Sequence, residues 1–302
     1  MSLNCPKCKI QDSSKILYSG YNQHIELHFE CTSHNKKDSK DLKPTLYKCL
    51  KCNLVYSEFI NIEFSKNYKP VIDEEYIKQI DFKKKTFEIF VRQIKKHLNK
   101  DSEVLEIGSY YGVLGSLIKP LVKNYIGTEL SIHAAKYARE NFDLNIINDA
   151  PDEYLKRGNK FDLIIMTDVI EHLDDPFTVL KLLEKNLNEN GIIIITTFNF
   201  DSLFSKIMGK NYPWILPFHK YYFSNSTIKK TLNDANLNVV KIENDIRLIS
   251  ADYLIKKLNV MIGSLGFLWK FIDRISFIKK LTFRINLYDL KIYYCTKIEK
   301  DI

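Results

Sequence analysis

Two glycines, Gly108 and Gly112, follow the short apolar segment 103–107 and precede an apolar run with helical spacing. Glycines at these positions let the backbone turn tightly and approach a ligand without side chains in the way. A helix that begins behind such a turn also offers free N–H groups to the ligand. The order of strand, glycine turn and helix therefore predicts a nucleotide-binding crevice in which the ligand lies against the main chain.

Three acidic residues in the same region indicate which ligand fits the crevice. Glu106 lies at the end of the first predicted strand, and Glu129 ends the next one, at 125–130. A carboxylate in the place of Glu129 can accept both hydroxyl protons of a ribose. Asp149 follows a further short apolar segment, 144–147. We therefore expect a ribose-containing ligand, held by acids at the ends of neighbouring strands.

Polar residues also stand at the end of the predicted strand 161–167, where Asp168, Glu171 and His172 follow a buried apolar run. An imidazole titrates near the working pH of most enzymes, so His172 is a candidate general base with two carboxyl groups beside it. The alternative interpretation is that His172 makes a hydrogen bond inside the turn and supports the scaffold.

These motifs closely resemble those of the class I S-adenosylmethionine-dependent methyltransferases, over roughly residues 85 to 245. The matching segments, in chain order, are Leu105-Glu-Ile-Gly108 with Gly112, Gly127-Thr-Glu129, Asp149, Asp168-Val-Ile-Glu-His172 and Asn190-Gly-Ile-Ile-Ile-Ile-Thr196. The resemblance implies a Rossmann-like α/β fold, in which a seven-stranded sheet carries one reversed edge strand. It also implies S-adenosyl-L-methionine as the cofactor.

The residues expected to bind this cofactor share positions at the ends of the strands and in the loops that follow. They are Glu106, Gly108, Tyr110, Gly112, Glu129, Leu130, Asp149 and Asp168. Among them, Asp168 is expected to line the methionine end. Members of the family usually carry a third glycine where this chain has Tyr110. Because the turn glycines are kept, we expect a bulkier variant of the loop and not a lost site.

Four cysteines near the N-terminus form two Cys-x-x-Cys pairs: Cys5 with Cys8, and Cys49 with Cys52. Four thiolates at such turns suit tetrahedral Zn²⁺, which would stabilise a segment with little apolar surface. The interval between the pairs is long, and Cys31 and His34 within it offer alternative or additional ligands. A coincidental pattern of free cysteines is the alternative. Similar ribbons precede resembling methyltransferases of sugar and glycan pathways, and we expect a structural zinc site that caps the fold.

A loop rich in proline and aromatic residues, 211–224, follows the fifth predicted strand at the level where an acceptor must sit. His219 in this loop is the second candidate base. Trp214, Tyr221 and Tyr222 are candidates for a lid or a sugar-stacking wall, although structural packing explains each of them equally well. Methyl transfer is an in-line displacement that requires alignment of the acceptor and removal of its proton. We therefore expect the acceptor site here.

Strands and helices are expected to alternate along the chain. The patterns predict strands at 103–107, 125–130, 144–147, 161–167, 191–197, 237–242 and 287–297, and helices at 112–121, 131–142, 151–156, 175–187 and from a cap at Asn225-Ser226 to about Ala235. We divide the chain into a zinc-ribbon-like segment, 1–70, and a methyltransferase domain, 71–302. The domain begins with lead-in helices at 71–100 and contains a helical insertion at about 248–285.

Composition and charge limit the location and the partners. With 302 residues and 45% hydrophobic content, the chain can bury a full α/β domain. Its net charge is +8, and from residue 247 onward eleven basic residues stand against five acidic ones. The insertion is thus a basic amphipathic segment that could lie on an anionic membrane surface, cover an acidic acceptor or pack on the enzyme. Without a leader pattern or an apolar run of about 18 residues, a cytoplasmic location is expected, with membrane association as a hypothesis.

The leading hypothesis for function is methylation of a small or glycan-linked acceptor, such as a nucleotide sugar of surface-polysaccharide biosynthesis, whose phosphates would suit the positive charge. The alternative is methylation of a lipid or quinone precursor at the membrane surface. A zinc-binding scaffold with an inactive methyltransferase fold is the non-enzyme alternative, but the acids at 106, 129 and 149 argue against it. No nucleic-acid partner is expected, because the N-terminal segment lacks basic runs interleaved with aromatics. A nicotinamide oxidoreductase would leave the motif at 168–172 unexplained.

Overall fold

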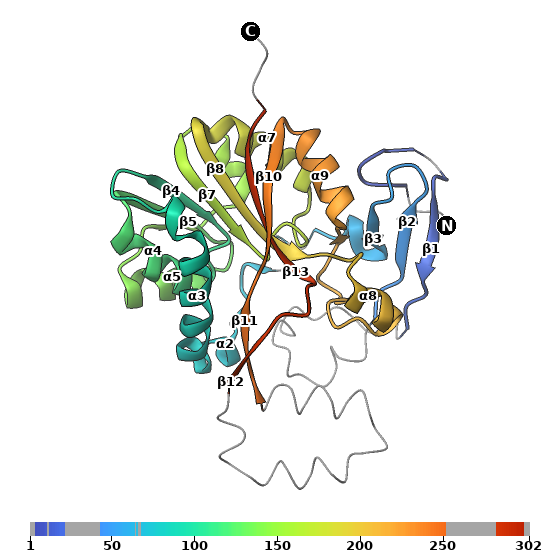
Figure 1. The fold of residues 1–302 in the computed structure, drawn as a ribbon, viewed down its shortest axis with the longest axis horizontal. Helices are drawn as coiled ribbons and strands as arrows, with labels where there is room; N and C mark the ends of the chain where they lie inside the picture. Colours follow the sequence, from blue (N-terminus) through green and yellow to red (C-terminus); the bar gives the residue numbers. More distant parts are fainter. Residues whose placement is uncertain are drawn as a thin grey trace, which may run out of the picture.

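A seven-stranded sheet forms the centre of the molecule (Figure 1). The structure is a computed structural model, and it describes residues 4–10, 12–21, 43–63, 65, 68–251 and 282–298. The sheet strands lie in the order β10-β13-β8-β7-β4-β5-β6. Their bounds are β4 Glu103–Ile107, β5 Asn124–Thr128, β6 Ile146–Ile147, β7 Phe161–Thr167, β8 Leu187–Phe198, β10 Leu237–Asn244 and β13 Leu290–Lys297. The predicted Rossmann-like seven-stranded sheet is confirmed.

The reversed strand β13 lies inside the sheet. It pairs antiparallel with β8 on one side and with β10 on the other, whereas β6, β5, β4, β7 and β8 pair in parallel. The expectation of a reversed strand at the edge was therefore wrong in its position, because β10 occupies that edge. Strand β10 does not pair with β8. Strand β13 lies between them and forms backbone hydrogen bonds with both neighbours.

Helices cover both faces of the sheet. Strand β7 is apolar on both sides: Leu163 and Ile165 face a cluster with α3, α4 and α5, whereas Ile164 and Met166 face a cluster with α6, α7 and α9. Burial on both faces explains why the strand reads as a continuous apolar run. The helix bounds are α2 Glu74–Lys78, α3 Ile80–Ile94, α4 Val113–Ile118, α5 Ile132–Phe142, α6 Pro151–Leu155, α7 Pro176–Asn186, α8 Leu203–Met208 and α9 Asn225–Asn233.

Side-chain caps fix several helix starts. Ser131 accepts a hydrogen bond from the amide of Ala134 at the start of α5, as the sequence predicted. Helix α9 is capped by Ser224, which forms a capping box with Thr227, and not by the expected Asn225-Ser226 pair. An N-cap residue has extended φ and ψ angles and stands just before the first helical residue. Ser224 meets both conditions, whereas Asn225 and Ser226 already belong to the helix.

A second, four-stranded antiparallel sheet joins the N-terminal segment to the loop 211–224, which we call the acceptor loop after the acceptor site predicted there. Its order is β1-β2-β3-β9, where β1 is Ser14–Tyr18, β2 Leu46–Cys49, β3 Val55–Ser57 and β9 Tyr221–Tyr222. Strand β9 belongs to the loop after β8, so residues more than 160 positions apart pair in register, Tyr56 with Tyr221. In Figure 1 this sheet lies beside the central one. The division at residue 70 stays a prediction, because the second sheet draws on both sides of it.

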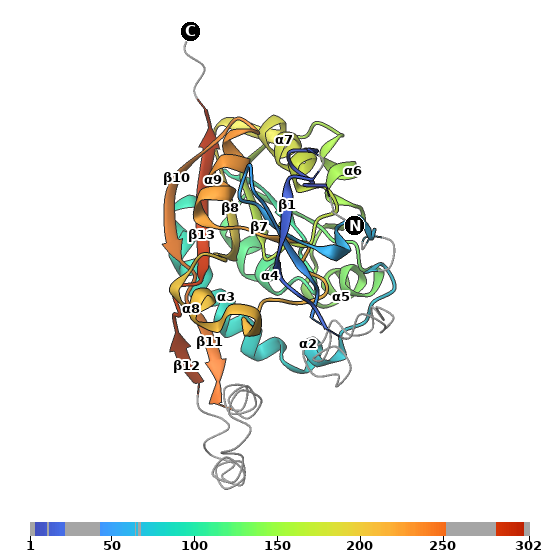
Figure 2. The same cartoon turned by 90° about the vertical axis from the view of Figure 1, so that its right-hand side faces the viewer.

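A two-stranded ribbon extends from the end of β10 and β13. It consists of β11, Arg247–Ser250, and β12, Thr282–Ile285, and Figures 1 and 2 show it pointing away from the central sheet. The helical insertion predicted at 248–285 is thus wrong at both ends, where antiparallel pairing forms strands instead. Residues 252–281 lie outside the described part of the chain.

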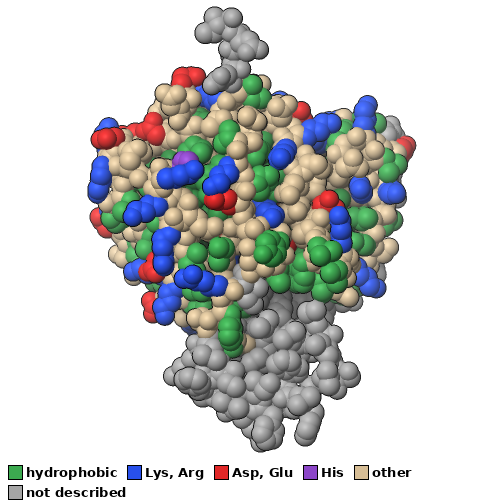
Figure 3. All heavy atoms as spheres, viewed as in Figure 1, with side chains coloured by type: hydrophobic (Ala, Val, Ile, Leu, Met, Phe, Trp, Pro, Cys, Tyr) green, Lys and Arg blue, Asp and Glu red, His purple; other side chains and the backbone are tan. Residues whose placement is uncertain are grey.

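The surface combines scattered charges with a few apolar side chains. Figure 3 shows lysine and arginine side chains spread over many elements of one face. On α8, Leu203 and Ile207 are 75% and 74% exposed. None of the described helices has the length and apolar character needed to cross a membrane.

Candidate active site and metal centre

The loop after β4 turns through two glycines in the left-handed region. Gly108 has φ 73° and Gly112 has φ 78°. A side chain at Gly108 would place its Cβ 2.5 Å from Cγ2 of Val169, and one at Gly112 would place its Cβ 2.6 Å from Cβ of Ala138. Both positions therefore exclude a side chain, by conformation and by contact. The predicted glycine turn is present between β4 and α4.

Tyr110 stands where resembling proteins carry the third glycine, and its φ is 48°. The left-handed conformation costs a residue other than glycine roughly 1–2 kcal/mol, which explains why glycine is usual there. This conformation aims the Tyr110 amide at Glu129, whose Oε2 accepts a hydrogen bond of 2.8 Å from it. The substituted loop thus keeps the main-chain path and adds a phenol ring.

Glu129 is held in one orientation by two backbone amides. It is buried, and its Oε1 accepts a second hydrogen bond of 2.7 Å from the amide of Ser131. Burial raises the pKa of the Glu129 carboxyl to about 7, although both amides act in the opposite direction. Two further hydroxyl donors, such as those of a ribose, would stabilise the ionised form. This chemistry fits the cofactor expected from the sequence.

A cluster of tyrosines covers the glycine loop from α2. The Tyr76 ring lies 4.6 Å from that of Tyr110 and 5.3 Å from that of Tyr111, measured between centroids. The Tyr110 hydroxyl donates to Oδ2 of Asp73 at 2.8 Å, and the Asp73 amide donates to the Tyr111 hydroxyl at 2.8 Å. Asp73 was not predicted as a site residue from the sequence, although an acidic residue just before a helix is a recognisable N-cap pattern.

Two predicted cofactor acids already have protein partners. Glu106 is buried beneath the loop, and its Oε2 accepts a 2.5 Å hydrogen bond from Tyr125. Asp149 forms a 2.6 Å ion pair with Arg157. These residues and Leu130 lie at or just beyond the carboxyl ends of β4, β5 and β6, as expected. Their contact with the cofactor stays a prediction.

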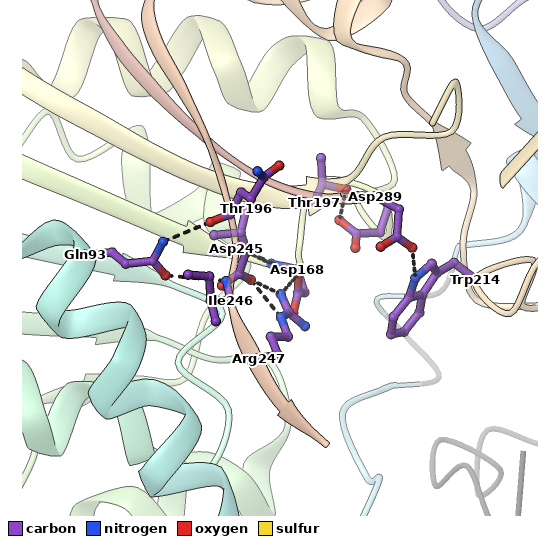
Figure 4. Close-up of polar contacts among 11 residues, drawn as sticks. Gln93, Asp168, Thr196, Thr197, Trp214, Asp245, Ile246, Arg247 and Asp289 are labelled. Carbon is purple, nitrogen blue, oxygen red and sulfur yellow. Dashed lines mark hydrogen bonds and ion pairs between the residues drawn. The ribbon is translucent and has the colours of Figure 1, made fainter. Parts of the chain in front are cut away.

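Asp168 follows β7 and is held from two sides (Figure 4). Thr196 of β8 donates to its Oδ1 at 3.1 Å. Arg247 binds both carboxylate oxygens, with Nη1 2.7 Å from Oδ2 and Nη2 2.8 Å from Oδ1. Burial raises the pKa of Asp168, but the guanidinium charge outweighs burial and holds it below the usual value. Sequence reasoning counted Arg247 only as a charge, since no local motif links it to a residue 79 positions away.

The two candidate bases meet between the β7 turn and the acceptor loop. The rings of His172 and His219 lie edge to face with centroids 4.6 Å apart. Nδ1 of His172 is 3.0 Å from the carbonyl of Phe218, and Nδ1 of His219 is 2.7 Å from that of Trp214. A carbonyl only accepts, so each neutral ring donates from Nδ1 and carries its lone pair on Nε2. Burial lowers the pKa of His172, which favours the neutral ring.

Glu171 adjoins this pair of imidazoles. Its carboxyl oxygen and the ligand nitrogens of His172 and His219 all lie within 4.8 Å of one another. Burial, followed by the charge of Asp168, raises the pKa of Glu171 to about 8, and Thr197 donates to its Oε2 at 3.1 Å. At neutral pH a protonated carboxyl thus stands beside the neutral ring of His172.

The aromatic residues of the acceptor loop divide into two groups. Tyr221 and Tyr222 are buried in β9, and their hydroxyls donate to the carbonyls of Asp174 and Leu216, both at 3.2 Å. Trp214 is half-buried and donates from Nε1 to Asp289 at 3.1 Å. The tyrosines therefore serve the second sheet, and an acceptor contact for any of the three stays a prediction.

The four predicted metal ligands come together at the end of the second sheet. The Sγ atoms of the two Cys-x-x-Cys pairs all lie within 4.8 Å of one another, and those of Cys5 and Cys52 are 3.7 Å apart. A tetrahedral zinc ion with Zn–S bonds of about 2.3 Å needs sulfurs about 3.8 Å apart, so the cluster fits Zn²⁺. The amide of Cys8 points to Cys5 Sγ and that of Cys52 to Cys49 Sγ, both at 3.5 Å. Cys31 and His34 lie outside the described residues.

Known proteins resemble this chain in sequence. Residues 79–242, more than half of the chain, match the family described as methyltransferase domain. The mitochondrial ubiquinone biosynthesis O-methyltransferase of Candida albicans is 28% identical over 221 residues, which cover 61% of this chain and 64% of that protein. The ubiquinone biosynthesis O-methyltransferase of Pelagibacter ubique is 32% identical over 156 residues, covering 48% and 61%. The chain thus spans about three fifths of the length of these relatives.

A solved structure shares the fold. The SAM dependent methyltransferase from Archaeoglobus fulgidus superposes with a TM-score of 0.51 and 22% identity, covering 74% of this chain and 100% of that one. The likeness extends the family match from the sequence to the arrangement of the sheet. On the family match, the seven-stranded sheet and the glycine loop with Glu129, the chain belongs to the S-adenosylmethionine-dependent methyltransferases.

Proposed function

We propose that this methyltransferase acts on a hydroxyl group of a small aromatic acceptor, of the kind that quinone precursors present. The relatives described above are named for O-methylation in ubiquinone biosynthesis, which supports the alternative expected from the sequence over a sugar acceptor. The observation that carries the proposal is the pair of imidazoles whose Nδ1 atoms both face backbone carbonyls, because a hydroxyl acceptor must lose its proton to a base during transfer.

The bound cofactor supplies an electrophilic methyl group on its sulfonium. His219 would receive the proton of the acceptor hydroxyl on Nε2, since its Nδ1 bonds the Trp214 carbonyl at 2.7 Å. That carbonyl fixes the ring orientation and stabilises the imidazolium that forms. His172 stands edge-on beside it and buries the site on the side of β7.

Product formation with a defined panel tests the proposal. The purified protein is incubated with S-adenosylmethionine and either a catechol or a nucleotide sugar, and S-adenosylhomocysteine is measured. We expect turnover with the catechol. Turnover with the nucleotide sugar alone would overturn the aromatic acceptor and favour the glycan hypothesis.

Variants test the role of the base. His219→Gln should lower kcat by about 10²- to 10⁴-fold while the cofactor Kd stays unchanged. The matched control is His133→Gln, which changes an exposed histidine on α5 and should leave kcat unchanged. Full activity in the His219 variant would exclude that residue as the base.

A further inference from the structure

Arg247 makes four polar contacts with two carboxylates beyond the end of β7. It stands at the start of β11 with its guanidinium between two carboxylates, Asp168 and Asp245 (Figure 4). Nη1 and Nη2 contact Asp168 at 2.7 and 2.8 Å, while Nε and Nη2 contact Asp245 at 2.7 and 2.6 Å. The side chain of Arg247 is still 24% exposed. It is therefore fixed in orientation and yet accessible.

The backbone around Arg247 is anchored to α3 and β13. The Gln93 side chain donates to the carbonyl of Asn244 at 2.9 Å and accepts from the amide of Ile246 at 3.5 Å (Figure 4). The amide of Asp245 donates to the carbonyl of Leu290 at 3.0 Å. These contacts hold the residues on both sides of Asp245, so the guanidinium is positioned before any ligand binds.

The bonding of Arg247 leaves capacity for one more anion. A guanidinium has five N–H donors, and the four contacts above use one of the two on Nη1. Lys83 of α3 adds positive charge nearby: its ammonium lies 5.3 Å from the Tyr76 ring centroid, with no ion pair to any described residue. Burial, followed by the charge of Arg247, lowers the pKa of Lys83. Two cations thus border a place where an anion would be stabilised.

This place lies next to the loop that is expected to hold the cofactor. Val169, directly after Asp168, has a methyl carbon only 2.5 Å from the Cβ position of Gly108. Strand β7 is the neighbour of β4, which in turn neighbours β5 with Glu129 at its end. A ligand with its ribose on Glu129 that extends across β4 therefore reaches Asp168 and Arg247 with its far end.

We propose that Arg247 binds the α-carboxylate of S-adenosylmethionine through Nη1, while Asp168 accepts hydrogen bonds from the α-ammonium. The inference rests on the assignment of this cofactor to the site. The amino-acid end of the cofactor is a zwitterion, and the Asp168–Arg247 ion pair presents the two opposite charges side by side. Asp245 holds Arg247 through Nε and Nη2, so the guanidinium keeps its orientation while the second N–H of Nη1 donates to the ligand.

Three ligands separate this role from a purely structural one. S-adenosylmethionine carries both charged groups, its decarboxylated analogue keeps the ammonium alone, and 5′-methylthioadenosine has neither. Titration calorimetry of Arg247→Met should show about 10- to 100-fold weaker binding of S-adenosylmethionine, as expected for loss of a charged hydrogen bond. Affinities for the decarboxylated analogue and for 5′-methylthioadenosine should stay within about twofold of wild type, because neither ligand offers a carboxylate.

Control variants guard against a folding defect, because Arg247→Met leaves Asp168 and Asp245 facing each other. Arg247→Met combined with Asp245→Asn removes one of these charges and should show the same ligand pattern. The matched control is Arg92→Gln on α3, whose side chain is 64% exposed and which should bind all three ligands as wild type does.

Two results would overturn the proposal. One is unchanged binding of S-adenosylmethionine by the Arg247 variants, and the other is an equal loss of all three ligands, which assigns Arg247 to the fold alone. If wild type binds none of the three ligands, the cofactor assignment itself fails. Binding of 5′-methylthioadenosine by wild type thus separates a failure of this inference from a failure of the proposed function.

Discussion

The buried carboxyl of Glu129 should make binding of the adenosine part of the cofactor depend on pH. Burial raises its pKa to about 7 in the protein without ligand, and a ribose with two hydroxyl donors favours the ionised form. Protonation below this value turns one carboxylate oxygen into a donor, so one ribose hydroxyl loses its acceptor. Affinity should therefore be full above pH 8 and should fall as the pH decreases through 7.

The size of the effect follows from the fraction of ionised Glu129. With a pKa of about 7, about a tenth of the carboxyl is ionised at pH 6 and about nine tenths at pH 8. If only the ionised form binds, Kd should be roughly tenfold higher at pH 6 than at pH 8, which corresponds to about 1.4 kcal/mol. The amides of Tyr110 and Ser131 hold the carboxylate in the same orientation throughout.

The assay uses 5′-methylthioadenosine, because this ligand has no amino-acid group that titrates in the same range. Its Kd is measured by calorimetry at half-unit steps from pH 6 to pH 8.5, with the wild type and with Glu129→Gln. The variant should bind more weakly and show a flat profile. A flat profile for the wild type, or a sloped one for the variant, would refute the reasoning, since other groups would then control the affinity.

Three more predictions concern the metal, the loop and the core. Cys49→Ser should lose bound zinc in metal analysis and should lower Tm by about 10 °C, because the second sheet is closed by the metal ligands. Tyr110→Phe should cost about 1–2 kcal/mol in urea denaturation, because it removes a donor from the buried Asp73 carboxyl. Burial raises the pKa of Glu106 to about 8, so folded wild type keeps a proton that the unfolded chain releases above pH 4.5. Its stability relative to Glu106→Gln should therefore fall by about 1.4 kcal/mol per unit as pH rises from 5.5 to 7.5.

The glycine turn that is expected to hold the cofactor could be predicted because its residues are local in sequence. The glycine turn follows β4 directly, and the left-handed angles of Gly108 and Gly112 require the residue type that the sequence shows. Strand β7 was placed without error, since an apolar run bounded by polar residues fits a strand buried on both faces. Tyr110 is the one residue of the loop that departs from the family pattern. Its positive φ shows that the backbone still has the left-handed conformation expected of a glycine there.

The features that the sequence did not predict depend on contacts between segments that are distant along the chain. Arg247 reaches Asp168 only because β10 and β13 form a hairpin beside β8, and no pattern near either residue indicates that pairing. The ends of the predicted insertion became strands for a related reason: residues 247–250 and 282–285 find each other across a long interval. Apolar residues at nearly helical spacing do not reveal such pairing, because strand formation depends on the partner.

The pairing of β3 with β9 connects the N-terminal segment to the loop in which the acceptor site is predicted. Tyr221 and its neighbour Lys220 donate their amides to the carbonyl of Glu171, and the Lys220 carbonyl accepts from the amide of Ser57 in β3. The sheet that carries the four cysteines is thus hydrogen-bonded, through one short strand, to the turn that carries His172 and the loop that carries His219. The family match ends at residue 242 and begins at residue 79, so it contains the cofactor loop but neither β3 nor Arg247. Proteins that share the matched region can therefore bind the same cofactor while the segments outside it differ, and in this chain those segments support the acceptor loop. It follows that acceptor choice should respond to changes in the N-terminal sheet even where cofactor affinity does not.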